Sequence, residues 1–351
     1  MSDSPDLALA PWQQRVYDQA AAALDAGRMG HALLFSGPAL LGKRRVAERL
    51  AARLLCQTAD AGARPCGGCR GCSLFQARSQ RDPLEQRPDG SPSHPWGHPA
   101  HPDAIFVGHA WRMSPSPPRQ MTVIPVDQVR ALSERLATTP QYGAVKVAII
   151  DPADDMNTNA ANALLKTLEE PVPGRYLWLV SANPAGLPAT IRSRCQQLEF
   201  RLPTPDEGMA WLQQQGHAPA AAGEALDAAR GHPGLADAWL RDGGIALRRE
   251  VADDLTALAR GEQAPSEVAK RWTADDVAAQ RLRHAADHAL ARAADLTDPR
   301  AGRSLAEWFD EANRTRELLR TTVRADLAVG ALLLQWHELA AAHRGPAGRR
   351  R

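Results

Sequence analysis

The sequence predicts an α/β fold in which helices cover both faces of a parallel sheet, followed by an all-helical region. Three short apolar runs have the character of buried strands, residues 31–36, 146–151 and 176–181, and they alternate with segments of helical spacing. A glycine-rich turn joins the first strand to a helix. Beyond Arg201 no strand pattern remains. Strands that alternate with helices favour a parallel sheet with both faces covered.

The helices predicted around this sheet carry apolar residues at helical spacing. They comprise residues 13–27, 46–54, 126–138 and 159–168, and Pro171 ends the last of them. Residues 80–120 are instead rich in Pro, His, Ser and Gly, which predicts a long surface loop interrupted only by the apolar piece 104–107. No helix or strand is expected to fix the spacing of four histidines there, so we expect them to be solvated and not to bind a metal: His94, His98, His101 and His109.

Composition excludes two classes of protein. The 351 residues include 42 Lys and Arg against 40 Asp and Glu, a net charge of +2, which excludes a generally basic nucleic-acid-binding surface. No window holds the roughly 18 uncharged apolar residues that a membrane helix needs. The first ten residues contain Asp3 and Asp6 and lack the basic-then-apolar pattern of a signal peptide. We therefore expect a cytoplasmic protein.

The glycine-rich turn, GPALLGKR at residues 37–44, has the pattern of a phosphate-binding loop. Gly37 and Gly42 would let backbone N–H groups point at phosphate oxygens, and Lys43 would reach the outer phosphates. Arg44, however, stands where a hydroxyl normally ligates Mg²⁺, and a guanidinium cannot coordinate a cation. An ordinary glycine turn before a helix is the alternative. Whether ATP or ADP binds this loop stays open.

The strand 146–151 ends in Asp151, the carboxylate expected to face the Mg²⁺ of such a loop. Pro152 follows, where a glutamate would polarise the attacking water, and proline has no acceptor for that task. Asp154 and Asp155 are expected to cap the next helix. Because each lost catalytic group costs about 10²-fold or more in rate, ATP hydrolysis by this chain's own site should be negligible.

Four of the five cysteines lie between positions 56 and 72, spaced C-x₉-C-x₂-C-x₂-C. In a cytosolic chain such crowding favours a metal over disulfides. Two CxxC steps let thiolates converge on one ion, so we predict structural Zn²⁺ bound by Cys56, Cys66, Cys69 and Cys72. Reduced thiols without metal and an iron–sulfur cluster are the alternatives, although the Cys-Pro typical of such clusters is missing. Four thiolates leave no open position for water, so the metal would not catalyse.

Ser193-Arg194-Cys195 follows the strand 176–181. A planar, permanently charged guanidinium at the end of a loop can reach the phosphates of a neighbouring molecule. On the residues alone, however, a solvated or ion-paired surface arginine is the favoured interpretation of Arg194, because most arginines are surface groups.

Together these features resemble the clamp-loader subunits of bacterial DNA polymerase III, within the AAA+ superfamily. The resemblance covers roughly residues 11–200, while the helical remainder is matched only by length and order. It rests on HALLFSGP at 31–38, the four-cysteine insertion, His101-Pro102-Asp103, NAANALLKTLEEP at 159–171 and IRSRC at 191–195.

The resemblance implies a chain of three domains within a ring of five subunits. The partners would be gamma/tau motor subunits and a delta subunit, with the sliding clamp contacted indirectly and primed DNA met through the complex. The assembly belongs to the DNA-directed DNA polymerase holoenzyme. The implied domains are an AAA+ nucleotide-binding-like core, 1–201, with its zinc module at 56–72, a helical lid, 202–243, a helical collar, 244–345, and a basic tail, 346–351.

Departures from the motor pattern indicate a non-motor subunit. Arg44 and Pro152 depart at both hydrolysis motifs, and residues 231–238 lack the lid arginine of the motors. The family has two non-motor subunits, and one of them lacks the Ser-Arg-Cys motif. Because this chain carries the motif at residues 193–195, the resemblance excludes that subunit. By this resemblance Arg194 is an arginine finger acting in trans on a neighbouring motor subunit, and no catalysis is expected from this chain alone.

Two other functions remain as alternatives. An ATP-hydrolysing motor subunit of the gamma/tau type would need a hydroxyl at position 44 and an acid at 152. A zinc-dependent DNA-binding module would need basic and aromatic residues around the cysteines, where only Arg64, Arg70, Phe75 and Arg78 are near.

Overall fold

The computed structural model describes residues 8–77, 101–112 and 119–343, apart from residues 295, 297, 320 and 322. The chain forms two compact units, residues 1–236 and 237–351. The division into three domains with boundaries at 201 and 243 stays a prediction. Among the described helices, none combines the length and the apolar character needed to cross a membrane.

The first unit is built on a five-stranded sheet in which every neighbouring pair of strands is parallel. The strand order is β2-β5-β6-β1-β7, so the three predicted strands and the apolar piece 104–107 all belong to this sheet. A separate two-stranded ribbon pairs β3 (Trp111–Arg112) with β4 (Arg119–Gln120). The strands of the large sheet are β1 (Ala32–Ser36), β2 (Ala104–Val107), β5 (Lys146–Ile150), β6 (Arg175–Ser181) and β7 (Gln196–Glu199).

The edge strand β7 is not predicted by the sequence. Only Leu198 among its four residues is buried, so the segment lacks the apolar run that marks the central strands. Its place is set by pairing with β1, in a register that puts Gln196 opposite Leu33. An edge strand has one sheet neighbour and one open side, and this removes the need for a continuous apolar sequence.

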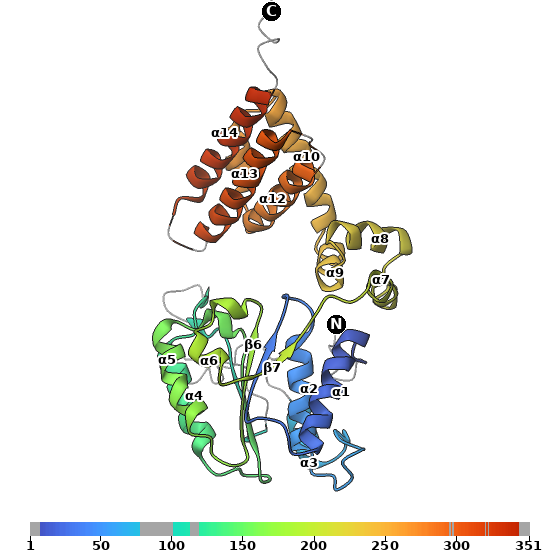
Figure 1. The fold of residues 1–351 in the computed structure, drawn as a ribbon, viewed down its shortest axis with the longest axis vertical. Coiled ribbons are helices and arrows are strands. Elements are labelled where there is room, and N and C mark those ends of the chain that lie inside the picture. Colours follow the sequence, from blue (N-terminus) through green and yellow to red (C-terminus); the bar gives the residue numbers. More distant parts are fainter. Residues whose placement is uncertain are drawn as a thin grey trace, which may run out of the picture. The chain divides into compact units, whose positions relative to one another are not determined.

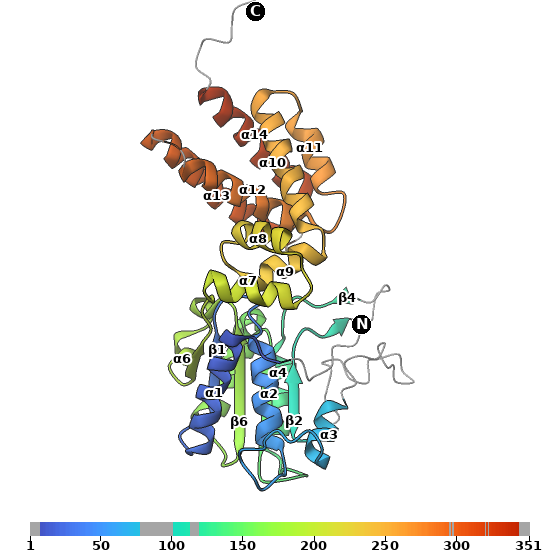
Figure 2. The same ribbon diagram turned by 90° about the vertical axis from the view of Figure 1, so that its right-hand side faces the viewer.

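Helices cover both faces of the sheet (Figure 1). Because side chains alternate along a strand, Leu33 and Phe35 share one core with α1, α2 and α3, whereas Leu34 shares another with α4, α5 and α6. Figure 2 shows α1, α2 and α3 on the face turned to the viewer. The short α3 is not predicted. The helices are α1 (Pro11–Asp25), α2 (Lys43–Leu55), α3 (Arg70–Gln76), α4 (Val126–Ala137), α5 (Thr158–Glu169) and α6 (Ala189–Arg192).

Short helices follow the last strand of the sheet. Thr204 and Glu207 form a reciprocal capping box at the start of α7. Trp211 of α7 meets Trp12 of α1 edge to face, with ring centroids 5.5 Å apart, which fixes α7 against the first helix. These helices are α7 (Pro205–Gln214), α8 (Pro219–Ala228) and α9 (Pro233–Arg241), and the boundary between the two units falls inside α9.

Two described histidines of the segment 80–120 correct the expectation of solvated side chains. His101 is only 2% exposed, and its Nδ1 accepts a hydrogen bond from the N–H of Asp103 at 3.1 Å. His109 is half-buried, with its Nε2 at 2.9 Å from an Asp155 carboxylate oxygen. The prediction is wrong for His101 because the segment 101–112 enters the sheet through β2. His94 and His98 lie outside the described residues.

The second unit is a helical bundle with tryptophans in its core. The rings of Trp308 and Trp336 lie 4.8 Å apart. Their indole N–H groups donate to the carbonyls of Leu332 and Leu255, at 3.0 and 2.8 Å. Burial therefore leaves neither indole N–H without an acceptor. The helices are α10 (Gly244–Arg260), α11 (Pro265–Trp272), α12 (Ala278–Ala294), α13 (Pro299–Leu318) and α14 (Ala325–His343).

A third buried tryptophan, Trp272, depends on a carboxylate. Its indole N–H donates to Asp254 Oδ2 at 2.8 Å. We predict that Asp254→Ala lowers the free energy of unfolding of this unit by about 1–3 kcal/mol, because the buried N–H loses its acceptor. Urea unfolding followed by tryptophan fluorescence measures the loss. Asp253→Ala, at an exposed neighbouring position, is the control, and equal losses in the two variants would contradict the assignment.

Candidate functional site

The glycine-rich loop leaves the carboxyl end of β1 and opens α2, as predicted. Gly37 and Gly42 have φ values of +134° and +81°, in the region that favours glycine. A Cβ atom at Gly37 would lie 2.2 Å from the carbonyl oxygen of Phe200, so a side chain there would collide with the segment that leaves β7. The loop thus has the backbone geometry expected from its sequence.

Lys43 turns back onto its own loop. Its Nζ donates hydrogen bonds to the carbonyls of Gly37 and Pro38 at 2.7 and 2.6 Å. Burial lowers the pKa of Lys43, while the nearby charges of Asp151 and Asp154 act in the opposite direction. To reach a phosphate, the ammonium would have to leave these carbonyls.

The start of α9 lies directly on this loop. Nε2 of His232 donates to the carbonyl of Ala39 at 2.8 Å. A Cβ atom at Gly234 would lie 1.9 Å from the carbonyl oxygen of Leu40, so only glycine permits this approach. By the resemblance, motor subunits carry an arginine in this segment. Here the segment contacts the loop through the His232 side chain and the backbone at Gly234.

Asp151 follows β5 at the same edge of the sheet. Nη1 of Arg44 lies 3.6 Å from Asp151 Oδ2, and Nε of Arg44 donates to Glu48 Oε1 at 2.9 Å. Burial raises the pKa of Asp151, and the positive charges of Arg44 and Lys43 oppose that shift. The structure brings the two predicted motifs together, and an ion pair joins them.

The expectation that Asp154 and Asp155 cap a helix is wrong. Asn157 caps α5 instead, with its side-chain oxygen accepting from the N–H of Ala160 at 2.8 Å. Asp154 accepts from the Ser181 hydroxyl at 2.5 Å and so ties the turn after β5 to the end of β6. Asp155 is paired with His109 instead, with its carboxylate oxygen 2.9 Å from Nε2.

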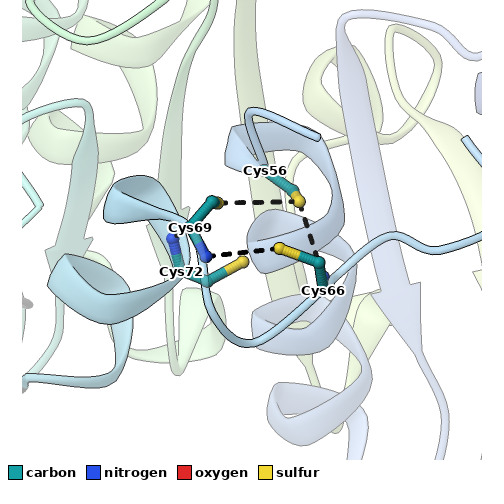
Figure 3. A group of neighbouring side chains, drawn as sticks. All are labelled: Cys56, Cys66, Cys69 and Cys72. Carbon is teal, nitrogen blue, oxygen red and sulfur yellow. Dashed lines mark hydrogen bonds between the residues drawn. The ribbon is translucent and has the colours of Figure 1, made fainter. Parts of the chain in front are cut away.

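The four predicted cysteine ligands come together in space (Figure 3). Their sulfur atoms all lie within 4.8 Å of one another, and those of Cys56 and Cys69 are 3.8 Å apart. Sulfurs at the corners of a tetrahedron around zinc, with Zn–S distances of about 2.3 Å, are about 3.8 Å apart. Cys56 ends α2, and Cys69 caps α3. The four thiol groups fit a tetrahedral metal ion.

Backbone N–H groups point at these sulfurs. The N–H groups of Cys66, Cys69 and Cys72 donate to the sulfurs of Cys56, Cys66 and Cys69, at 3.5, 3.3 and 3.4 Å. A hydrogen bond with Thr58 and those from the backbone lower the pKa of Cys66 to about 6. Burial raises the pKa of Cys72 to about 12. A bound cation would offset this cost by favouring the thiolate.

Tyr142 joins the cysteine module to the core, a role that the sequence does not signal. Its carbonyl accepts from Gln57 Nε2 at 2.9 Å, and its hydroxyl accepts from Arg70 at 3.2 Å. The Arg70 guanidinium also lies over the Tyr142 ring, 5.1 Å from its centroid. The N–H of Tyr142 donates to the fully buried carboxylate of Asp103 at 2.8 Å. The His-Pro-Asp motif thereby supports the module through one loop.

Arg194 and the phosphate-binding-type loop lie at opposite ends of β7. Arg194 precedes Gln196, the first residue of the strand, whereas Gly37 packs against Phe200 beyond its last residue. The four residues of β7 span about 13 Å. The structure therefore separates Arg194 from the loop of its own chain.

The Arg194 guanidinium is ion-paired. Its Nη2 lies 2.7 Å from an oxygen of Glu169, the last residue of α5, and its Nη1 donates to the Thr190 carbonyl at 2.9 Å. The side chain is 36% exposed, and exposed pairs of this kind contribute about 0–1 kcal/mol. The residues alone do not single out Glu169, although it lies in the stretch 159–171 that carries the resemblance.

Loop, acid and arginine thus occupy set positions on one parallel sheet. The glycine-rich loop follows β1, the carboxylate follows β5, and the arginine precedes β7. This arrangement defines a nucleotide-binding-type core of the AAA+ class.

Comparisons with known proteins place the chain within this class. The family model described as "DNA polymerase III, delta subunit" matches residues 12–204. DNA polymerase III subunit delta' of Pseudomonas aeruginosa is 36% identical over 264 residues, 75% of this chain and 70% of that protein. The delta' subunit of Escherichia coli K12 is 32% identical over 206 residues, 58% of this chain and 52% of that protein. The chain belongs to the DNA polymerase III delta subunit family.

Relatives with a different subunit name also resemble this chain. DNA polymerase III subunit tau of Escherichia coli K12 is 32% identical over 190 residues, 54% of this chain but 24% of that protein. The chain matches about half the length of the Escherichia coli and Haemophilus influenzae delta' subunits. The similarity to the delta' subunits of Pseudomonas aeruginosa and Escherichia coli extends over more of this chain than the similarity to tau.

Proposed function

We propose that this chain acts as the delta-prime, non-motor subunit of a DNA polymerase III clamp loader in the cytoplasm. In this role it forms a pentameric ring with gamma/tau motor subunits and a delta subunit. The ring places the sliding clamp on primed DNA, which this chain meets through the complex. Membership in the family whose relatives are named delta' supports the proposal.

Within that assembly, Arg194 acts as an arginine finger on the ATP site of the adjacent motor subunit. The observation that carries this role is the separation of Arg194 from its own loop by the length of β7. A partly exposed guanidinium in a weak ion pair with Glu169 can be released to a phosphate at low cost. Catalysis then belongs to the neighbour, and the isolated chain should not hydrolyse ATP.

Substitution of Arg194 tests this role. In a reconstituted loader where only the adjacent motor site can turn over, Arg194→Ala should slow ATP hydrolysis by about 10³-fold or more, because the transition state loses its cation. Steady-state phosphate release measures the rate, and gel filtration checks that the ring assembles. Arg201→Ala, with 81% of the side chain exposed just beyond β7, is the control. Unchanged hydrolysis in an assembled Arg194→Ala loader would rule out the finger.

The cysteine module holds a structural Zn²⁺ through Cys56, Cys66, Cys69 and Cys72. The mutual sulfur distances and the N–H groups directed at the sulfurs support this proposal. The ion would join the end of α2 to α3, and the contacts at Tyr142 would carry this order into the sheet. Its role is to hold structure, because all four ligand positions are protein thiolates.

Elemental analysis of the purified chain should find about one zinc per chain. Cys69→Ser should lose most of it and lower the melting temperature by at least about 4 °C, because the closed four-ligand site is broken. Cys195→Ser is the matched control, since Cys195 is buried outside the cluster. Loss of zinc from both variants, or full stability after chelation, would contradict the assignment.

A further inference from the structure

Arg44 is held from three sides. Nε donates to Glu48 one turn further along α2, Nη1 faces Asp151 after β5, and the guanidinium lies over the ring of Phe106 in β2, 5.8 Å from its centroid. Phe106 is only 3% exposed. Two carboxylates and an aromatic ring therefore contact the one guanidinium of Arg44.

This placement bears on the divalent cation that the fold class implies. In nucleotide-binding loops of this type, the residue after the loop lysine and the carboxylate at the second strand end both serve the Mg²⁺. Here those positions are Arg44 and Asp151, and their side chains face each other across 3.6 Å. A guanidinium offers only donors, so the residues present do not fit a divalent cation.

Charge leads to the same conclusion. Asp151 lies within electrostatic range of two further carboxylates, Asp154 and Glu48, and of two cations, Lys43 and Arg44. With all five ionised, the group carries −1. Without Arg44 it carries −2 and would attract a divalent cation.

We infer that Arg44 is a built-in replacement for the divalent cation of the nucleotide site. Its guanidinium neutralises Asp151, excludes metal from the site and ties α2 to the ends of β2 and β5. These elements are then held together without metal or nucleotide. The inference concerns the chain's own loop and stands or falls separately from the role of Arg194 in the clamp loader.

Metal binding by the full chain tests the inference. We use Mn²⁺, whose free form is counted by electron paramagnetic resonance, added to zinc-loaded protein. The wild-type chain should bind no Mn²⁺ at this site. Arg44→Ala should gain a site at least about tenfold tighter than any in the wild-type chain, because the carboxylates lose their internal cation. Adding Asp151→Asn to Arg44→Ala should abolish that site.

The control removes an equal charge from the same helix. Arg49→Ala serves, because the Arg49 guanidinium lies over the Tyr17 ring, 5.6 Å from its centroid and on the α1 side of α2. If Arg44→Ala fails to fold, as judged by circular dichroism, Arg44→Gln keeps much of the side-chain length without the charge. Tight Mn²⁺ binding by the wild-type chain, no gain in a folded Arg44 variant, or an equal gain in Arg49→Ala would each overturn the inference.

Discussion

The parallel pairing of buried strands is the constraint on which the rest of the first unit depends. Because all five strands run the same way, the loop after β1 and the carboxylate after β5 emerge at one edge of the sheet, although about a hundred residues separate them in sequence. The same constraint puts Arg194, which precedes β7, at the other edge. The phosphate-binding-type loop and the proposed arginine finger of one chain therefore lie at opposite edges of the sheet.

The charged side chains near the glycine-rich loop find their partners within the chain. Lys43 is bonded to loop carbonyls, Arg44 faces Asp151, and Asp154 is bonded to Ser181. Lys43 is buried and the other three groups are partly exposed, and each has a partner that offsets its loss of water. A site that supplies its own partners holds these elements together, which agrees with the proposed non-motor role.

The cysteine module is supported from the same core. The module contacts Tyr142, and the carboxylate of Asp103 holds the Tyr142 loop. This carboxylate accepts hydrogen bonds from the N–H groups of Tyr142 and Gln141, each at 2.8 Å. The cysteine module thus shares a support with β2 and β5. Local order in the module and order in the sheet are coupled through one buried carboxylate.

Local sequence determined the central strands, the glycine-rich loop and the cysteine cluster, because apolar runs, positive-φ glycines and CxxC spacing act over a few residues. It did not determine β7. That segment has one buried residue, Leu198, and it forms a strand only by pairing with β1. The burial of His101 and the ion pairs Arg44–Asp151 and Arg194–Glu169 were likewise decided by tertiary structure. Those contacts join segments that are distant in sequence, and no local pattern encodes which distant group a side chain will meet.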